Sequence, residues 1–167
     1  MIKILRAPEY EIITNPLIFL AGPIQGAPDW QAEAISILSQ SNAEFSIASP
    51  RRLAEKKGNF SVDKYNEQVD WETHHLRLAG KTGVIMFWMA KEAYDVPGRA
   101  YAQTSRFELG EWKTRHELLK IKLVLGIELG FTNEKYLRRR LKQDCHDIEI
   151  QSTLAETCAE ALRLLSL

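Results

Sequence analysis

The 167-residue chain has few of the features that mark metal, redox or disulfide-rich proteins. It has only two cysteines, Cys145 and Cys158, and they are not spaced as a metal-binding or dithiol motif. The four histidines form neither His-Glu-x-x-His nor another zinc signature. We therefore expect no metal ion, and we expect reduced thiols in an intracellular, cytoplasmic protein.

Several motifs of other protein classes are missing as well. The chain has no Gly-x-Gly-x-x-Gly fingerprint, no Walker loop and no Gly-x-Ser-x-Gly elbow, so we expect no redox cofactor and no serine triad. No apolar run has the length of a membrane span or a signal peptide. Lys plus Arg and Asp plus Glu both number 22, and this balance argues against a surface for nucleic acid or anionic membranes.

Apolar runs alternate with helical patterns along the whole chain. Strands are predicted at residues 17–24, 45–49, 83–89, 123–128 and 148–151, and helices at 29–41, 61–79, 104–117, 133–144 and 153–165. The alternation predicts an α/β fold of flavodoxin or Rossmann type, a single domain over residues 1–167 with an open, parallel, five-stranded sheet and helices on both faces. The unbroken run at 83–89 is expected near the centre of the sheet. The first ten residues could add an edge strand.

The loop after the first predicted strand is a candidate binding loop. Ligands of such folds bind beyond the carboxyl ends of the strands, near the switch in strand order. Gly22 would let a ligand approach the backbone, and the helix that begins near Trp30 offers free N–H groups. A plain strand-to-helix turn explains the same residues, so the loop alone does not define a site.

Two acidic residues flank Trp71 in the predicted helix at 61–79. Asp70 and Glu72 cannot share one helix face, so one of them is expected to face a cleft while the other meets solvent. Trp71 and Trp88 are candidate walls for a flat heterocycle. The alternative is a solvated acidic face beside a core tryptophan.

Glu108 stands near the start of the predicted helix at 104–117. The helix macrodipole would favour its ionised form there, and a carboxylate at a strand-end cleft can attack an anomeric carbon. Gly110 is expected to let the helix pack closely on the sheet. The alternative is a first-turn glutamate that only stabilises its helix.

Three segments taken together resemble the nucleoside 2-deoxyribosyltransferase family. They read IFLAGPI at 18–24 with Trp30, QVDWETHHL at 68–76 running into GVIMFW at 83–88, and RFELGEW at 106–112. The resemblance covers roughly residues 17–115. It implies cleavage or transfer of the N-glycosidic bond of a nucleoside or nucleotide, with Glu108 as the nucleophile in the family's Glu-[Leu/Ile]-Gly motif.

The resemblance also suggests roles for other residues. Many relatives carry an aspartate where this chain has His75, so Glu72 or Asp70 is the candidate acid that protonates the departing base. Arg51, Arg52 and Arg106 would suit a 5′-phosphate if they face the site. The candidate substrate-binding residues are Gly22, Pro23, Ile24, Trp30, His75, Trp88 and Arg106. The family further implies a homo-oligomer in which a neighbouring subunit helps to close each site, a small-molecule ligand and no cofactor.

Two further departures leave a second function open. Many relatives have an aspartate where this chain has Gly83, and the loop at 103–106 lacks the acid that the transferases often carry. The alternative is therefore a binding module with the same fold, which would sense a nucleotide or nucleotide derivative without turnover.

Overall fold

The structure is a computed structural model that describes residues 2–53 and 62–167. Most of the polar loop expected at 51–59, and the first residue of the helix expected at 61–79, lie outside the described residues.

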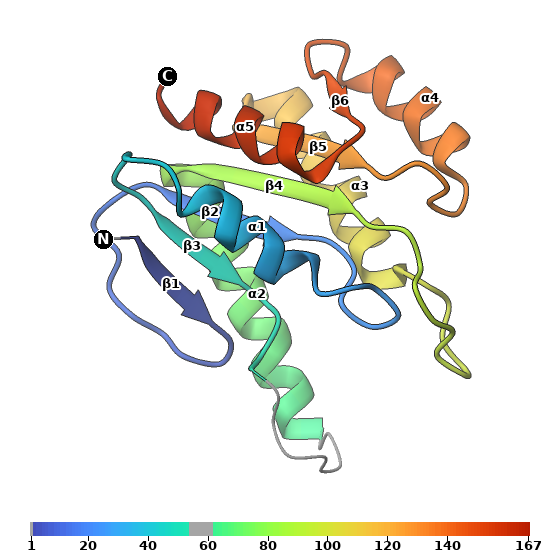
Figure 1. The fold of residues 1–167 in the computed structure, drawn as a ribbon, viewed down its shortest axis with the longest axis horizontal. Coiled ribbons are helices and arrows are strands. Elements are labelled where there is room, and N and C mark those ends of the chain that lie inside the picture. Colours follow the sequence, from blue (N-terminus) through green and yellow to red (C-terminus); the bar gives the residue numbers. More distant parts are fainter. Residues whose placement is uncertain (1, 54–61) are drawn as a thin grey trace.

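All strands of the sheet run parallel, in the order β1-β3-β2-β4-β5-β6 (Figure 1). Because β2 lies between β3 and β4, the strand order switches between β2 and β4, where this class of fold binds its ligands. The strands are β1 (Lys3–Arg6), β2 (Leu17–Ala21), β3 (Ser46–Ser49), β4 (Val84–Met89), β5 (Leu123–Ile127) and β6 (Ile150–Gln151).

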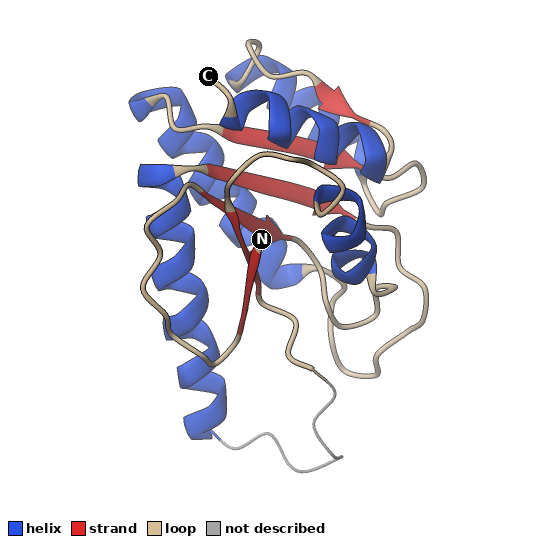
Figure 2. Ribbon diagram, turned by 60° about the vertical axis from the view of Figure 1, so that its left-hand side comes forward, coloured by secondary structure: helices blue, strands red, loops and turns tan. Residues whose placement is uncertain are grey.

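Helices cover both faces of the sheet. Side chains of α1 and α5 pack in one core, on one face, and side chains of α2, α3 and α4 pack in the other, on the opposite face (Figures 1 and 2). The first turns of α2 extend past the edge of the sheet (Figure 1). The helices are α1 (Trp30–Leu38), α2 (Val62–Thr82), α3 (Gln103–Leu119), α4 (Glu134–Asp144) and α5 (Leu154–Leu165).

Side chains of β4 divide between the two cores. Phe87 and Met89 join the core under α2 and α3, whereas Met86 and Trp88 join the core under α1 and α5. Every residue of β4 is buried, and the strand stands near the middle of the sheet, as the apolar run predicts. A catalytic group on α2 or α3 therefore lies on the other side of the sheet from Trp88.

The predicted α/β architecture with a parallel sheet is confirmed, but the predicted count of five strands is one too low. The sixth strand is β1, which pairs parallel with β3 at the edge, with Leu5 opposite Ala48. Only Leu5 is fully buried among its four residues. A single buried position gives too weak a pattern to identify a short edge strand from sequence.

Side-chain caps hold the first turns of α1 and α5. Asp29 is the N-cap of α1, and its side chain accepts a hydrogen bond of 3.1 Å from the backbone N–H of Ala32. Thr153 and Glu156 form a reciprocal capping box at the start of α5. Across the described ranges, no helix combines the length and the apolar character that a membrane crossing requires.

Candidate active site

Two of the three predicted catalytic residues meet between neighbouring helices. Glu72 of α2 and Glu108 of α3 share a hydrogen bond between their carboxyl groups, and both side chains are partly buried. The helices lie close together because Gly80 has no side chain: a Cβ there would stand 2.9 Å from the ring of Trp112. This contact brings the segments 68–76 and 104–112 together.

A carboxyl–carboxyl hydrogen bond requires a proton, and the surroundings decide which residue holds it. Burial, the negative charge of Glu72 and the bond to Glu72 raise the pKa of Glu108 to about 8, and Glu111 adds to the effect. Burial also raises the pKa of Glu72, but the hydrogen bonds from Gln68 and Glu108 and the charge of Arg52 act against that rise. Near neutral pH the pair therefore carries one shared proton, held mainly by Glu108.

Gln68 connects the pair to the carboxyl end of β3. Its Nε2 donates to Glu72 Oε1 at 2.6 Å and to the Pro50 carbonyl at 2.8 Å, and its Oε1 accepts from Arg52 Nε at 2.7 Å. Gln68 is not among the residues that the sequence patterns single out. The only available signal was its i, i+4 spacing from Glu72, which places both side chains on one face of a helix.

Asp70, the third predicted catalytic residue, does not join the pair. Its side chain is exposed, whereas Glu72 turns toward Glu108. The two side chains diverge because positions i and i+2 point to different sides of a helix.

The predicted physical setting of Glu108 was wrong in two respects. Helix α3 begins at Gln103, so Glu108 lies in its second turn, and the macrodipole that favours anions acts mainly in the first turn. Gly110 is exposed, and a Cβ there would touch nothing within 4 Å, so it is not the residue that allows close packing. Glu108 instead owes its environment to burial beside Glu72.

The loop after β2 is packed against the protein itself. Gly22 has φ +150°, and a Cβ there would lie 2.2 Å from the Trp88 carbonyl oxygen, so this glycine lets β2 end against β4. Gly22 was expected to make room for a ligand, but the space that its missing side chain leaves is taken by the Trp88 carbonyl. Pro23 is buried and accepts a hydrogen bond of 2.8 Å from the indole N–H of Trp30, while Ile24 is partly exposed.

None of the three tryptophans singled out from the sequence forms a wall of the carboxyl pair. Trp30 and Trp88 belong to the core under α1 and α5, on the opposite face of the sheet. Trp71 is fully buried in the core under α2, and its indole N–H donates to the Glu9 carbonyl at 2.7 Å. These residues stabilise the fold around the site.

His75 is buried one turn after Glu72. Its ring lies 4.0 Å from that of Trp71, and its Nδ1 is 2.8 Å from the Trp71 carbonyl oxygen. Since a carbonyl only accepts, Nδ1 carries the proton, and Nε2 has no hydrogen-bond partner among the described residues. Burial lowers the pKa of His75, which favours the neutral ring.

The three arginines that were expected to bind a phosphate donate hydrogen bonds to other residues of the chain. Arg51 donates to Gln31 and to the carbonyls of Ile24 and Pro28. Arg52 donates to Gln68 and Glu67. Arg51 therefore ties the loop at 22–30 to the end of β3, next to Pro50, which binds Gln68. All three predicted segments thus reach the same carboxyl edge of the sheet.

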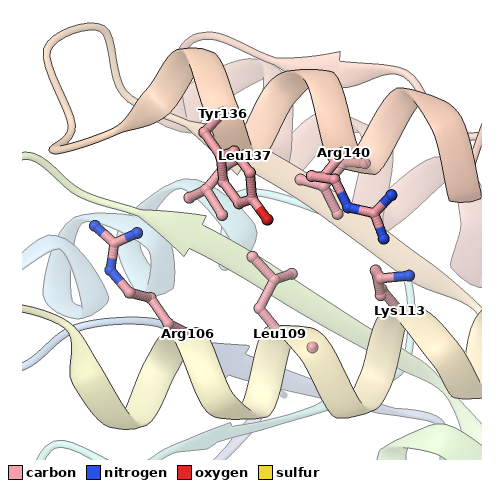
Figure 3. A pocket seen from close by; sticks show the side chains of 8 residues that line it. Arg106, Leu109, Lys113, Tyr136, Leu137 and Arg140 are labelled. Atoms are coloured by element: carbon pink, nitrogen blue, oxygen red, sulfur yellow. The ribbon is translucent and has the colours of Figure 1, made fainter.

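Arg106 lies on a different side of α3 from Glu108. Its guanidinium stacks 4.6 Å from the centre of the Phe131 ring and donates to the Thr132 carbonyl at 2.6 Å. It lines a groove of about 170 Å³ between α3 and α4, with Tyr136 and Arg140 across from it (Figure 3). The structure does not bring Arg106 to the carboxyl pair.

The loop after β4 is hydrogen-bonded to the loop after β2. The Gly26 carbonyl accepts hydrogen bonds from the backbone N–H groups of Ala93 and Tyr94, at 2.8 and 3.2 Å. The hydroxyl of Tyr101 donates to the Ala90 carbonyl at 2.6 Å. Burial raises the pKa of Tyr101 above its usual range, so the phenol keeps its proton and this bond. The sequence analysis did not select Tyr101, because no pattern marks a loop tyrosine that packs inward.

The described residues include no group of three or more His, Cys, Asp or Glu side chains that could hold a metal ion. The pair itself offers two carboxyl groups with one proton, next to the amide of Gln68 and the guanidinium of Arg52.

Comparison with known proteins identifies one family. A family model described as "Nucleoside 2-deoxyribosyltransferase like" matches residues 15–122, which is well over half of the chain. The matched segment contains Glu72, Glu108 and Gln68. No curated protein matches the chain.

Proposed function

The chain belongs to the nucleoside 2-deoxyribosyltransferase-like family, and on that premise we propose that it cleaves or transfers the N-glycosidic bond of a nucleoside or nucleotide. The observation that carries the proposal is the hydrogen-bonded pair of Glu72 and Glu108 at the carboxyl edge of the sheet. Two neighbouring carboxyl groups, one ionised and one protonated, are what glycosidic bond cleavage requires.

In the first step, a carboxylate oxygen of Glu108 attacks C1′ of the sugar while the bond from C1′ to the base nitrogen breaks. The departing base takes a proton from Glu72, and the sugar stays on Glu108 as an ester. The proton rests mainly on Glu108 in the free protein, so the scheme requires that it move to Glu72 before Glu108 attacks. One proton in the pair is thus enough for both roles.

In the second step, the nitrogen of an acceptor base, or a water molecule, attacks C1′ from the opposite side. The ester bond breaks, the Glu108 carboxylate is restored, and Glu72 recovers the proton that the acceptor loses. The hydrogen bond between the two carboxyl groups leaves no space for a water molecule between them, which favours this covalent route over the inverting one. Retaining glycosidases hold their carboxyl groups about 5–5.5 Å apart, whereas inverting enzymes hold them farther apart to admit a water molecule.

The test is incubation with a panel of nucleosides and 5′-nucleotides, with and without an acceptor base, followed by chromatography. Free base without acceptor indicates hydrolysis, and an exchanged base indicates transfer. If a compound binds, by calorimetry, and no base is released under any condition, the protein is a binding module with this fold. The absence of a carboxylate at His75 supports that second candidate, because many relatives carry an aspartate there.

We extend the proposal to assembly and location. The first half of α2 exposes three apolar side chains, Val62, Tyr65 and Val69, and such residues suit contact with a second copy of the chain. Both cysteines are free thiols, in keeping with a cytoplasmic protein.

A further inference from the structure

The side-chain amide of Gln68 has only one orientation that satisfies its neighbours. Arg52 Nε can only donate, so the Gln68 atom that faces it at 2.7 Å must be the oxygen. The Pro50 carbonyl can only accept, so the atom that faces it at 2.8 Å must be the nitrogen. These two partners fix the amide independently of Glu72.

The fixed amide constrains the carboxyl group next to it. The Gln68 nitrogen is the atom that faces Glu72 Oε1, at 2.6 Å, so this oxygen accepts a hydrogen bond and a proton on Glu72 could lie only on Oε2. A donated hydrogen bond stabilises the ionised carboxylate more than the neutral acid. The positive charge of Arg52 acts on Glu72 from the same side. On the other side, Glu111 places a negative charge near Glu108. The neighbours of Glu72 favour its ionised form, and the neighbour of Glu108 favours the protonated form of Glu108.

We propose that Gln68 is the positioning residue of the carboxyl pair, and that its locked amide keeps Glu72 ionised and directs the shared proton to Glu108 in the free protein. Because this bond favours one ionised carboxyl group, it widens the pH range over which the pair holds a single proton, and the proposed reaction uses that one proton after it has moved to Glu72. The catalytic consequence rests on the proposed function, whereas the proton placement does not.

The direct test follows the pair by carbon NMR in the full-length protein without ligand. The carboxyl signals are assigned by their loss in Glu72→Gln and Glu108→Gln and are titrated from acid to base. In Gln68→Met, Glu72 loses a hydrogen bond to its ionised form, so we expect the first ionisation of the pair to move up by about one pKa unit. The second ionisation removes the proton of Glu108 and leaves Glu72 charged throughout, so it should move little.

Two further variants separate this effect from a general loosening of the site. Gln68→Glu keeps an acceptor for Arg52 but places a negative charge against Glu72, so it should raise the first ionisation as well. Gln40→Met makes the same chemical change at an exposed position at the end of α1 and should leave both ionisations where they are. Thermal melting shows whether each variant is folded.

The outcomes distinguish this proposal from the proposed function. If the first ionisation of folded Gln68→Met stays at the wild-type value, Gln68 does not place the proton and the inference is overturned. If it moves while no substrate is turned over, the inference stands and the proposed function fails. Where turnover is found, the acidic limb of the pH profile should move up by about one unit in Gln68→Met with the basic limb unchanged. A merely structural role would lower the rate equally at every pH.

Discussion

A carboxyl group that touches another carboxyl group titrates as half of a pair, because two negative charges at contact distance cannot both persist in a poorly solvated place. Glu72 and Glu108 meet this condition between α2 and α3. Which residue accepts protons and which donates them is then decided by the neighbours, here Gln68, Arg52 and Glu111.

The first prediction concerns the nucleophile. Glu108→Gln keeps the shape of the side chain and can still donate to Glu72, so we expect a folded protein that binds its ligand. The amide cannot attack C1′, so base release should fall by about 10³-fold or more. The measurement is single-turnover chromatography on the best substrate of the panel. Added formate or azide should restore turnover to Glu108→Ala by replacing the missing carboxylate.

Glu72→Gln is the matched comparison for that variant. Loss of a general acid costs about 10²–10⁴-fold, and the loss should be smallest for bases that leave readily without a proton. A Glu108→Gln variant with near-normal turnover would contradict the assignment, and the nucleophile would then have to be sought at Glu72.

At the residue scale, sequence reasoning could identify the two glutamates but not their contact. Glu108 was found through its Glu-Leu-Gly motif and Glu72 through its place beside Trp71. The role of Gln68 depends on Pro50 and Arg52, which lie 18 and 16 residues away in the chain. No periodic pattern encodes such a contact, because it exists only after α2 has packed against the end of β3.

At the scale of elements, the closest backbone approach near the site lies where β2 ends beside β4. A side chain at position 22 would meet the Trp88 carbonyl at 2.2 Å, in a backbone conformation that residues with a Cβ rarely adopt. Gly22→Ala should therefore lower the free energy of unfolding by about 3 kcal/mol or more. Chemical denaturation measures the loss.

Gly110→Ala is the control for the Gly22 prediction. Gly110 lies in the interior of α3, and a Cβ there meets nothing within 4 Å. Alanine should stabilise this helix by about 0.5–1 kcal/mol, because glycine costs more backbone entropy on folding. Equal effects of the two alanines would show that steric contact at Gly22 is not what the structure indicates.

The elements themselves were predictable to within a few residues, because each carries a strong local pattern. The burial of all six residues of β4 and the capping by Asp29 follow directly from the apolar run and the cap signal. Strand β1 was expected only as a possible addition, because its pairing with β3 depends on residues more than 40 positions away. The side of the sheet on which Trp88 packs was not considered from the sequence, although the alternation of side chains along β4 determines it.

At the scale of the whole molecule, we expect the chain to self-associate. Val62, Tyr65 and Val69 are exposed apolar residues in the first half of α2. Because the formal net charge of the chain is zero, two copies would not repel each other through their net charge. Light scattering should give at least twice the chain mass of 19.1 kDa. Val69→Lys should shift the protein toward the monomer, whereas a mass of one chain for the wild type at micromolar concentration would contradict the expectation.

The carboxyl pair should also make the free energy of unfolding of the protein depend on pH. The pKa of Glu108 rises from an ordinary 4.5 to about 8 on folding, so the folded state holds a proton that the unfolded chain releases. The stability that this proton contributes is complete below pH 4.5 and is lost as the pH rises toward about 8. Burial lowers the pKa of His75, which acts in the opposite direction over part of this range. A single melting curve therefore mixes the two effects.

Comparison with Glu108→Gln isolates the carboxyl pair, because His75 is the same in both proteins. The variant has no proton to lose at position 108, so its stability relative to the wild type should increase steadily between pH 4.5 and about 8 and level off above. One proton sets an upper limit of about 1.4 kcal/mol per pH unit for this slope. Denaturant titrations of both proteins at several pH values measure it. If the curves of unfolding free energy against pH run parallel for the two proteins, Glu108 titrates normally. That result would contradict both the shared proton and the reaction scheme that depends on it.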